Sequence, residues 1–306
     1  MIAMFTRILC PVDFSSASLH AVDQASVLAR WYHASITALH VCNPSEAPPD
    51  SHQRVSDSDE IRLSSEVRAL FGAAIRDGLP VNVIVGAGQP QRVILERAAM
   101  LPADLIVMGT HGATGFEHLV LGSVAEKVLR RAGCAVLTVP PHANRTSTLP
   151  FKRVLCAVDF SEWSLRALEL ARSLTRESGA ALTAVTVIEW PWPEPPPPSF
   201  DELPPAQAGA LREYRRYVET GATRRLTALA DESAAAGVAV AVRVGHGKPH
   251  VEILRAAADI GADLIVIGVH GRNGLDLQIF GSTTNHVVRH ATCPVLTLRS
   301  QAQRGS

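Results

Sequence analysis

The sequence predicts an α/β protein made of two tandem domains, each a doubly wound, Rossmann-like sheet of five parallel strands. Three observations lead to this fold class. The chain has 306 residues, which is enough for two domains of ordinary size. Long segments of its first half match segments of its second half. Within each half, short continuous apolar runs alternate with stretches whose apolar residues recur at helical spacing.

The internal matches define the domain organisation. "RILCPVDFS" at 7–15 matches "RVLCAVDFS" at 153–161, and "ADLIVMGTHG" at 103–112 matches "ADLIVIGVHG" at 262–271. The first match is offset by 146 positions and the second by 159, so the second copy contains extra residues. We expect domains at 1–140 and 151–300, a polar linker at 141–150, and a proline-rich insert at 189–207.

The elements of the first copy follow in order. A strand at Ile8–Val12 precedes a helix that starts in "SSASLHAVDQ", where a serine is the expected N-cap. Continuous apolar strands are typical of a parallel sheet that helices cover on both faces. The later strands are expected at Ile36–Val41, Val81–Val85, Leu105–Met108 and Ala135–Val139, and the later helices near Glu60–Asp77 and at Arg92–Ala99 and Val124–Arg131.

Composition excludes several classes of partner. The formal net charge is zero, which argues against a nucleic-acid-binding protein, because such proteins normally carry a basic excess. No apolar run reaches membrane-spanning length, and the N-terminal segment has no signal-peptide pattern. We therefore expect a cytoplasmic protein with no nucleic-acid or membrane partner.

The five cysteines favour buried thiols over a disulfide framework. Cys10 matches Cys156 in the other copy, and Cys134 matches Cys293, whereas Cys42 has no counterpart. Duplicated strand positions explain these pairs, since free cysteine is among the most buried residue types.

Polar and glycine residues recur where the strands are expected to end. They are Asp13 and Gly109 in the first copy and Asp159 and Gly268 in the second. Ligands of open parallel sheets bind at the carboxyl ends of the strands. After the fourth strand each copy has the pattern G-x2-G-x9-G-S followed by a helix, whose first N–H groups could bind a phosphate. Two other roles remain open: the glycines could serve turns and caps, and the aspartates could cap the following helix.

These motifs resemble the universal stress protein family, along nearly the whole chain and in two copies. The resemblance rests on "PVDFS" and "AVDFS", on G-x-G-x-P at Gly86–Pro90 and Gly245–Pro249, and on the G-x2-G-x9-G-S pattern of the family's ATP-binding branch. It implies ATP with Mg²⁺ as the ligand. It also implies that Val136–Val139 pairs with Val295–Leu298, so that the chain forms an internal pseudo-dimer.

The resemblance assigns site residues in both copies. Asp13 and Asp159 would contact adenosine, Val41 and Val187 would meet adenine through their backbone, and the glycine loops would hold ribose and phosphates. Arg272 has no basic counterpart in the first copy, which makes the second site the expected tighter one. The loop residues are Gly109, His111, Gly112, Gly122, Ser123 and Val124 in the first copy and Gly268, His270, Gly271, Arg272, Gly281, Ser282 and Thr283 in the second.

The twelve histidines do not predict a metal site. His286 and His290 have i,i+4 spacing on the expected last helix, for which a solvated or capping role is favoured. In the insert, Trp190, Trp192 and Phe200 are expected to pack on the domain body. A lid over the second nucleotide site, or a docking segment for a partner, is the alternative.

The sequence thus predicts an ATP-binding regulatory module for stress responses, with slow ATP hydrolysis at most. A homodimer and an unidentified protein partner are further candidates. A nucleotide-dependent enzyme on the same scaffold, such as an ATPase or adenylyl transferase, is the alternative, because fold does not fix function. The third hypothesis is a scaffold that binds no nucleotide and binds a protein partner.

Overall fold

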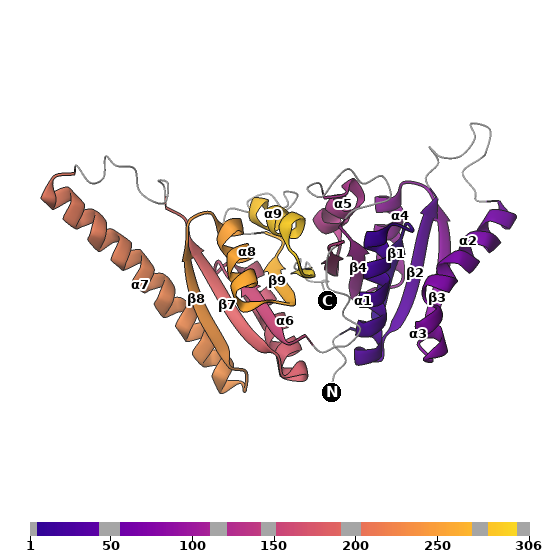
Figure 1. Ribbon diagram of the computed structural model, residues 1–306, viewed down its shortest axis with the longest axis horizontal. Helices are drawn as coiled ribbons and strands as arrows, with labels where there is room; N and C mark the ends of the chain where they lie inside the picture. Colours follow the sequence, from indigo (N-terminus) through magenta and orange to yellow (C-terminus); the bar gives the residue numbers. More distant parts are fainter. Residues whose placement is uncertain are drawn as a thin grey trace, which may run out of the picture. The chain divides into compact units, whose positions relative to one another are not determined.

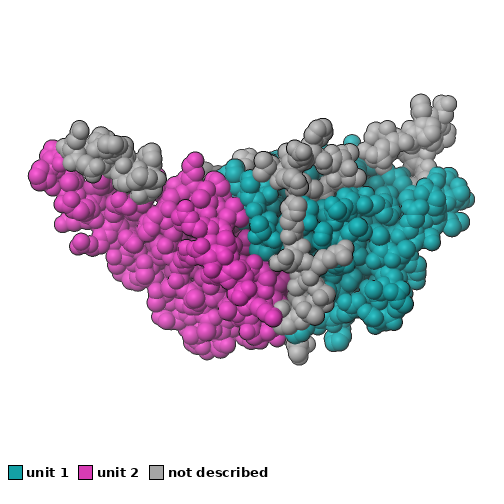
Figure 2. Space-filling view, viewed as in Figure 1, with its two compact units in different colours: residues 1–150, 274–306 teal, residues 151–273 magenta. Residues whose placement is uncertain are grey.

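The computed structural model of the chain describes residues 5–42, 56–110, 121–141, 151–190, 203–270 and 281–298 (Figure 1). The chain forms two compact units, coloured separately in Figure 2. Unit 1 comprises residues 1–150 and 274–306, and unit 2 comprises residues 151–273. The last helix and strand of the second sequence copy therefore belong to unit 1.

Unit 1 contains a parallel sheet with strand order β3-β2-β1-β4-β5 among the described residues. The order reverses between β1 and β4, which makes this the topological switch point. The strands are β1 Arg7–Val12, β2 Ser35–Cys42, β3 Val81–Ala87, β4 Leu105–Gly109 and β5 Ala135–Val139, and the helices are α1 Ser16–Tyr32, α2 Asp57–Leu70, α3 Gly72–Arg76, α4 Pro90–Met100 and α5 Ser123–Arg131.

Unit 2 repeats most of this arrangement, with strand order β8-β7-β6-β9 among the described residues and all neighbours parallel. Its switch point lies between β6 and β9. The elements are β6 Arg153–Ala157, α6 Glu162–Ser178, β7 Ala181–Ile188, α7 Pro205–Ala235, β8 Val240–His246, α8 Pro249–Ile260 and β9 Leu264–Gly268. The predicted fold class is confirmed: helices and strands alternate, and the sheets are mostly parallel.

The central strands form the core, as their continuous apolar sequences predict. Every residue of β5 and β9 is buried, and so is every residue of β1 and β6 after the first. The outer strands β3 and β8 are partly exposed. Helix α1 packs on β4, β1 and β5, and α6 packs on β9 and β6 (Figure 1). Because both faces are covered, the central strands need apolar side chains at consecutive positions.

The pairing of the two last strands is also confirmed. The remaining elements of unit 1 are α9 Ser282–His290 and β10 Val295–Leu298, and β10 runs antiparallel to β5 with Leu296 opposite Leu137. Two buried threonines reinforce the ladder. The Thr138 hydroxyl donates to the Val295 carbonyl and the Thr297 hydroxyl to the Val136 carbonyl, each at 3.2 Å.

The expected helix at 60–77 is two helices, which corrects the sequence interpretation. Helix α2 ends at Leu70, and α3 begins at Gly72. Phe71 between them is 1% exposed, and its N–H donates to the carbonyl of Arg68, three residues back. The tighter turn lets this aromatic ring enter the core, so tertiary packing overrides a continuous helical pattern.

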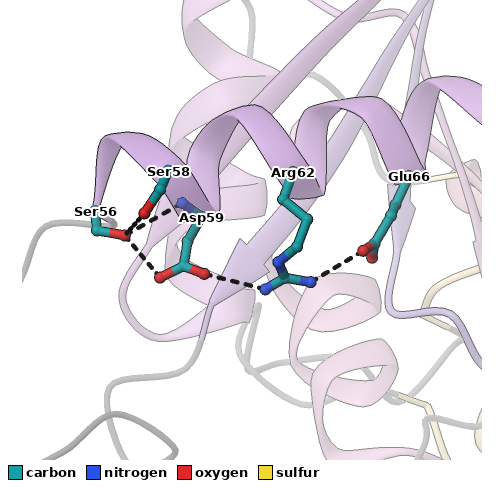
Figure 3. A network of polar contacts seen from close by, with 5 residues as sticks. All are labelled: Ser56, Ser58, Asp59, Arg62 and Glu66. Carbon is teal, nitrogen blue, oxygen red and sulfur yellow. Dashed lines mark hydrogen bonds and ion pairs between the residues drawn. The ribbon is translucent and has the colours of Figure 1, made fainter.

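A polar network stabilises the start of α2 (Figure 3). The Ser56 hydroxyl accepts from the Asp59 N–H at 3.2 Å and donates to the Asp59 carboxylate at 2.7 Å. Arg62 bridges Asp59 and Glu66 at 3.2 and 3.0 Å. The hydrogen bond from Ser56 and the contact with Arg62 lower the pKa of Asp59. The network is exposed and local, and it fixes a helix end that few buried side chains hold.

The second copy places part of its extra length in α7, which has 31 residues. The helix begins at Pro205, inside the segment 189–207 that is expected to be the proline-rich insert. Proline is compatible with this position because the first helical N–H needs no partner. Trp190 is 6% exposed and lies under the Arg215 guanidinium, 5.1 Å from the ring centre. Trp192 and Phe200 lie outside the described residues.

All five cysteines are free thiols, as the sequence predicts. Cys10 and Cys156 are fully buried in β1 and β6, and burial raises the pKa of both thiols well above the usual range. Burial, with a smaller effect of the Asp104 carboxylate, raises the pKa of Cys134 to about 12. These groups are protonated and unreactive at neutral pH, which suits a structural role.

Candidate functional site

In unit 1 the predicted residues lie at one edge of the sheet. Asp13 follows β1, Val41 is the penultimate residue of β2, and Gly109 ends β4. Since these strands are parallel, their carboxyl ends share an edge, and the switch point lies between the strands that carry Asp13 and Gly109. Asp104 lies at the opposite, amino edge, where its carboxylate accepts from the N–H groups of Thr6 and Arg7 at 2.9 and 3.1 Å.

Asp13 supports the cap of α1 without being the cap itself. The N-cap is Ser15, whose hydroxyl accepts from the Ser18 N–H at 3.2 Å. Asp13 Oδ1 accepts from the Ser15 hydroxyl at 2.6 Å and from the Ser15 N–H at 3.1 Å. The predicted serine cap is confirmed. One oxygen of the Asp13 carboxylate thus anchors the start of α1.

The second copy repeats this arrangement in unit 2. Asp159 Oδ1 accepts from the Ser161 hydroxyl and N–H at 2.6 and 3.0 Å, and Ser161 caps α6. The Asp159 N–H donates to the Ser164 hydroxyl at 3.2 Å. The same three positions thus perform the same local task in both copies, and this task alone would preserve them in a duplication.

The residue after each aspartate is a phenylalanine in a left-handed backbone conformation, with φ of 62° at Phe14 and 66° at Phe160. A bulky residue there is strained, and such strain often marks a functional position. In unit 1 the Phe14 ring lies 4.8 Å from the His40 ring, and His40 Nδ1 donates to the Val12 carbonyl at 2.9 Å. Sequence reasoning assigned no role to either residue; the repeated "DFS" was an available signal for Phe14 alone.

Unit 2 gives its phenylalanine a different neighbour. The Arg225 guanidinium of α7 lies 4.0 Å from the centre of the Phe160 ring. A cation over an aromatic face is attracted by the ring quadrupole. The longer helix of the second copy thus contributes a positive charge beside the residue that follows Asp159, and the position that matches His40 is Thr186.

The strand-end glycines have a packing role. A Cβ on Gly109 would lie 2.8 Å from the Ala17 carbonyl carbon and 2.9 Å from the Ala17 Cβ. A Cβ on Gly268 would lie 3.0 Å from the Trp163 Cβ. Gly109 lets the first turn of α1 approach β4, and Gly268 lets the first turn of α6 approach β9. Their presence therefore requires no ligand, and the packing interpretation of these two positions gains support.

Hydrogen bonds join the end of β4 in unit 1 to the end of β5 and to the start of α5. The Thr110 N–H donates to the Val139 carbonyl at 3.2 Å, and the Gly122 N–H donates to the Thr110 carbonyl at 2.8 Å. Helix α5 then begins with exposed Ser123 and half-buried Val124. Gly122 has no side chain with which to cap the helix. The structure thus brings the start of α5 next to the end of β4; His111 and Gly112 lie outside the described residues.

The structure describes seven of the site residues predicted for the second copy. Asp159, Val187, Gly268 and His270 belong to unit 2, where His270 is 5% exposed with its ring 5.3 Å from that of Trp163. Gly281, Ser282 and Thr283 start α9 in unit 1. Gly271 and Arg272 lie outside the described residues.

Two features are absent from the described part of the chain. It holds no group of three or more histidine, cysteine, aspartate or glutamate residues placed to bind a metal ion. None of its helices is both long and apolar enough to span a bilayer.

Comparison with known proteins places the chain in a family. The model of the universal stress protein family matches residues 4–140 and 150–299. Universal stress protein Rv2005c of Mycobacterium tuberculosis is 28% identical, over 94% of this chain and 95% of its own length. A universal stress protein structure from Archaeoglobus fulgidus is 25% identical, with a TM-score of 0.68 over 97% of this chain and 98% of that chain. A universal stress protein solved in complex with cAMP is 25% identical over 45% of this chain and 98% of its own, with a TM-score of 0.35. The chain is therefore a tandem member of the universal stress protein family.

Proposed function

We propose that the protein is a regulatory module that binds ATP at the carboxyl edge of each sheet. The observation that carries this proposal is the start of α5. Ser15 occupies an N–H of the first turn of α1, whereas Gly122 leaves the corresponding groups of α5 without a side-chain cap. Uncapped N–H groups and the positive end of the helix dipole form an anion site. The exposed Ser123 hydroxyl adds a donor for the phosphates.

The adenosine end of the ligand would lie toward Asp13 and Val41. Asp13 is at the switch point, where ligands of such sheets bind. A carboxylate can accept about four hydrogen bonds, so Asp13 can hold Ser15 and a ribose hydroxyl together. Asp159 and Val187 take the same roles in the second copy. There Arg272 would pair with a phosphate, and we expect tighter binding at that site.

We also propose a metal ion, a rate of hydrolysis, a cellular location and a route of signalling. ATP would bind with Mg²⁺, and hydrolysis would be slow at most. The five free thiols favour a reducing compartment, so we place the protein in the cytoplasm. Signalling would pass to a protein partner, either from the single chain or from a homodimer.

Calorimetric titration of Mg-ATP into ligand-free protein tests the proposal. Asp13→Asn and Asp159→Asn keep an oxygen that can accept from the capping serine, but remove the charge and the second acceptor. A hydrogen bond to a charged group contributes about 1.5–3 kcal/mol, so each change should weaken its own site roughly tenfold or more. Asp104→Asn is the matched control, because it alters the same residue type at the amino edge of the sheet.

The Mg-ATP titrations can have three results, each of which supports or refutes the proposed site. Loss of affinity in the two crevice variants, with Asp104→Asn unchanged, supports the proposed site. Equal affinity in all variants would place the nucleotide elsewhere. No heat from folded, ligand-free wild-type protein would refute ATP binding altogether. Circular dichroism of each variant separates loss of a contact from loss of α1 or α6.

A further inference from the structure

Helix α9 carries two histidines on one exposed face. His286 and His290 are four residues apart, and both are exposed. Their ring centres are 6.2 Å apart, and the ring planes differ by 18°. The spacing is that of the paired histidines in helical zinc sites, where i and i+4 side chains lie one above the other. The first copy has Lys127 and Arg131 at the matching positions of α5.

Both imidazoles are held in the same tautomer. His286 Nδ1 lies 2.9 Å from the Ser282 carbonyl oxygen, and His290 Nδ1 lies 2.8 Å from the His286 carbonyl oxygen. A carbonyl oxygen only accepts, so each Nδ1 carries the hydrogen. In a neutral ring the lone pair is then on Nε2. Histidines that bind metal through Nε2 almost always have this arrangement, because the Nδ1–H bond fixes the ring and raises the basicity of the ligand nitrogen.

The surrounding charges also permit a cation. His290 is the last residue of α9, where the negative end of the helix dipole favours positive charge. The one cationic side chain between the two histidines, Arg289, lies 3.8 Å from the Glu126 carboxylate of α5 and is 32% exposed. Glu126 also pairs with Arg130 at 2.8 Å, so it balances only part of the positive charge beside the two histidines.

We propose that His286 and His290 chelate a divalent transition-metal ion through their two Nε2 atoms, with water in the remaining positions. Imidazole is a good ligand for Ni²⁺, Cu²⁺ and Zn²⁺ and a poor one for Mg²⁺ and Ca²⁺. A metal–nitrogen distance of about 2.1 Å requires the two Nε2 atoms to lie within about 4 Å of each other. The ring centres are 6.2 Å apart, so both exposed rings must rotate towards one another, and their Nδ1 hydrogen bonds must bend with them.

This site does not depend on the proposed nucleotide site. It uses the exposed face of α9, whereas the nucleotide proposal is argued from the first N–H groups of α5. ATP binding and metal chelation are therefore separate tests, and either can fail alone.

Calorimetric titration of Ni²⁺ into protein without a polyhistidine tag, at pH 7.5 and with Mg²⁺ in excess, measures the chelation. The variants are His286→Gln and His290→Gln, which keep a polar side chain of similar size. Loss of one of two ligands should lower affinity at least tenfold in each. The gain-of-site variant Lys127→His/Arg131→His installs the same pair on α5, and we expect it to bind one further equivalent.

The titrations of the two glutamine variants either support or overturn chelation by His286 and His290. Matching losses in the two glutamine variants, with unchanged thermal melting in the absence of metal, support chelation by the pair. Loss in only one of them would mean a site with other ligands and would overturn the proposal. Nickel binding that both variants retain would assign it to other histidines, with the same consequence.

Discussion

Replacing Gly109 by alanine should destabilise unit 1 by about 2 kcal/mol, although it adds one methyl group. The added Cβ would lie 2.8–2.9 Å from three atoms of Ala17, two of them backbone atoms. Ordinary carbon contacts are about 3.5–4.0 Å, so α1 must move by more than half an ångström. Overpacking of this kind costs about 1–3 kcal/mol, and contact with backbone favours the upper end. The smaller conformational entropy of unfolded alanine offsets about 0.4–1 kcal/mol.

Alanine at two other glycines should cost less, because an added Cβ at each would have more space. Gly268→Ala meets Trp163 at 3.0–3.1 Å and should cost less than Gly109→Ala. Gly133→Ala meets nothing within 4 Å and should be neutral or slightly stabilising. Urea denaturation followed by circular dichroism measures the free energy of unfolding of each variant. A Gly109→Ala protein as stable as the Gly133→Ala protein would refute the packing explanation.

Three further predictions follow from the described contacts. Gly209→Ala and Gly221→Ala in α7 add a Cβ in open space, so each should raise the free energy of unfolding by about 0.5–1 kcal/mol in urea titrations; destabilisation by either would show that α7 needs its glycines. Ser15→Ala removes the cap of α1 and should cost about 1 kcal/mol in the same assay, whereas an unchanged midpoint would mean that water replaces the hydroxyl. Burial raises the pKa of Cys134 from 9.0 to about 12, so its thiol stabilises the folded state below pH 9, and this contribution is lost as the pH rises from 9 to 12. Stability measured from pH 8.5 to 10 should fall less steeply in Cys134→Ala, and parallel curves would contradict the raised pKa.

The strands and the capping serines could be predicted because their causes are local. A run such as "RILCPV" is apolar at consecutive positions, and burial on both faces is the direct result. Ser15 precedes a helical pattern and bonds within four residues of itself. The pairing of β5 with β10 has no local signal; it came from the family resemblance.

Other features depend on tertiary contacts that the sequence does not display. Phe71 divides a continuous helical pattern because its ring enters the core. The need for glycine at Gly109 arises from Ala17, ninety-two positions earlier. The left-handed conformation of Phe14 and its contact with His40 are equally hidden, since most bulky residues avoid that conformation.

The antiparallel pairing of β10 with β5 has a consequence for synthesis on the ribosome. Thr138 and its partner Val295 are 157 positions apart. At about 5–20 residues per second, the ribosome needs roughly 8–30 s to make the intervening chain. Throughout that interval β5 is complete but has no neighbour on this side, and an open strand edge is a template for unwanted pairing. The nascent chain is therefore most vulnerable to aggregation after the first copy has been made and before the second is complete. A chaperone that covers an exposed strand edge would act on the chain at that stage.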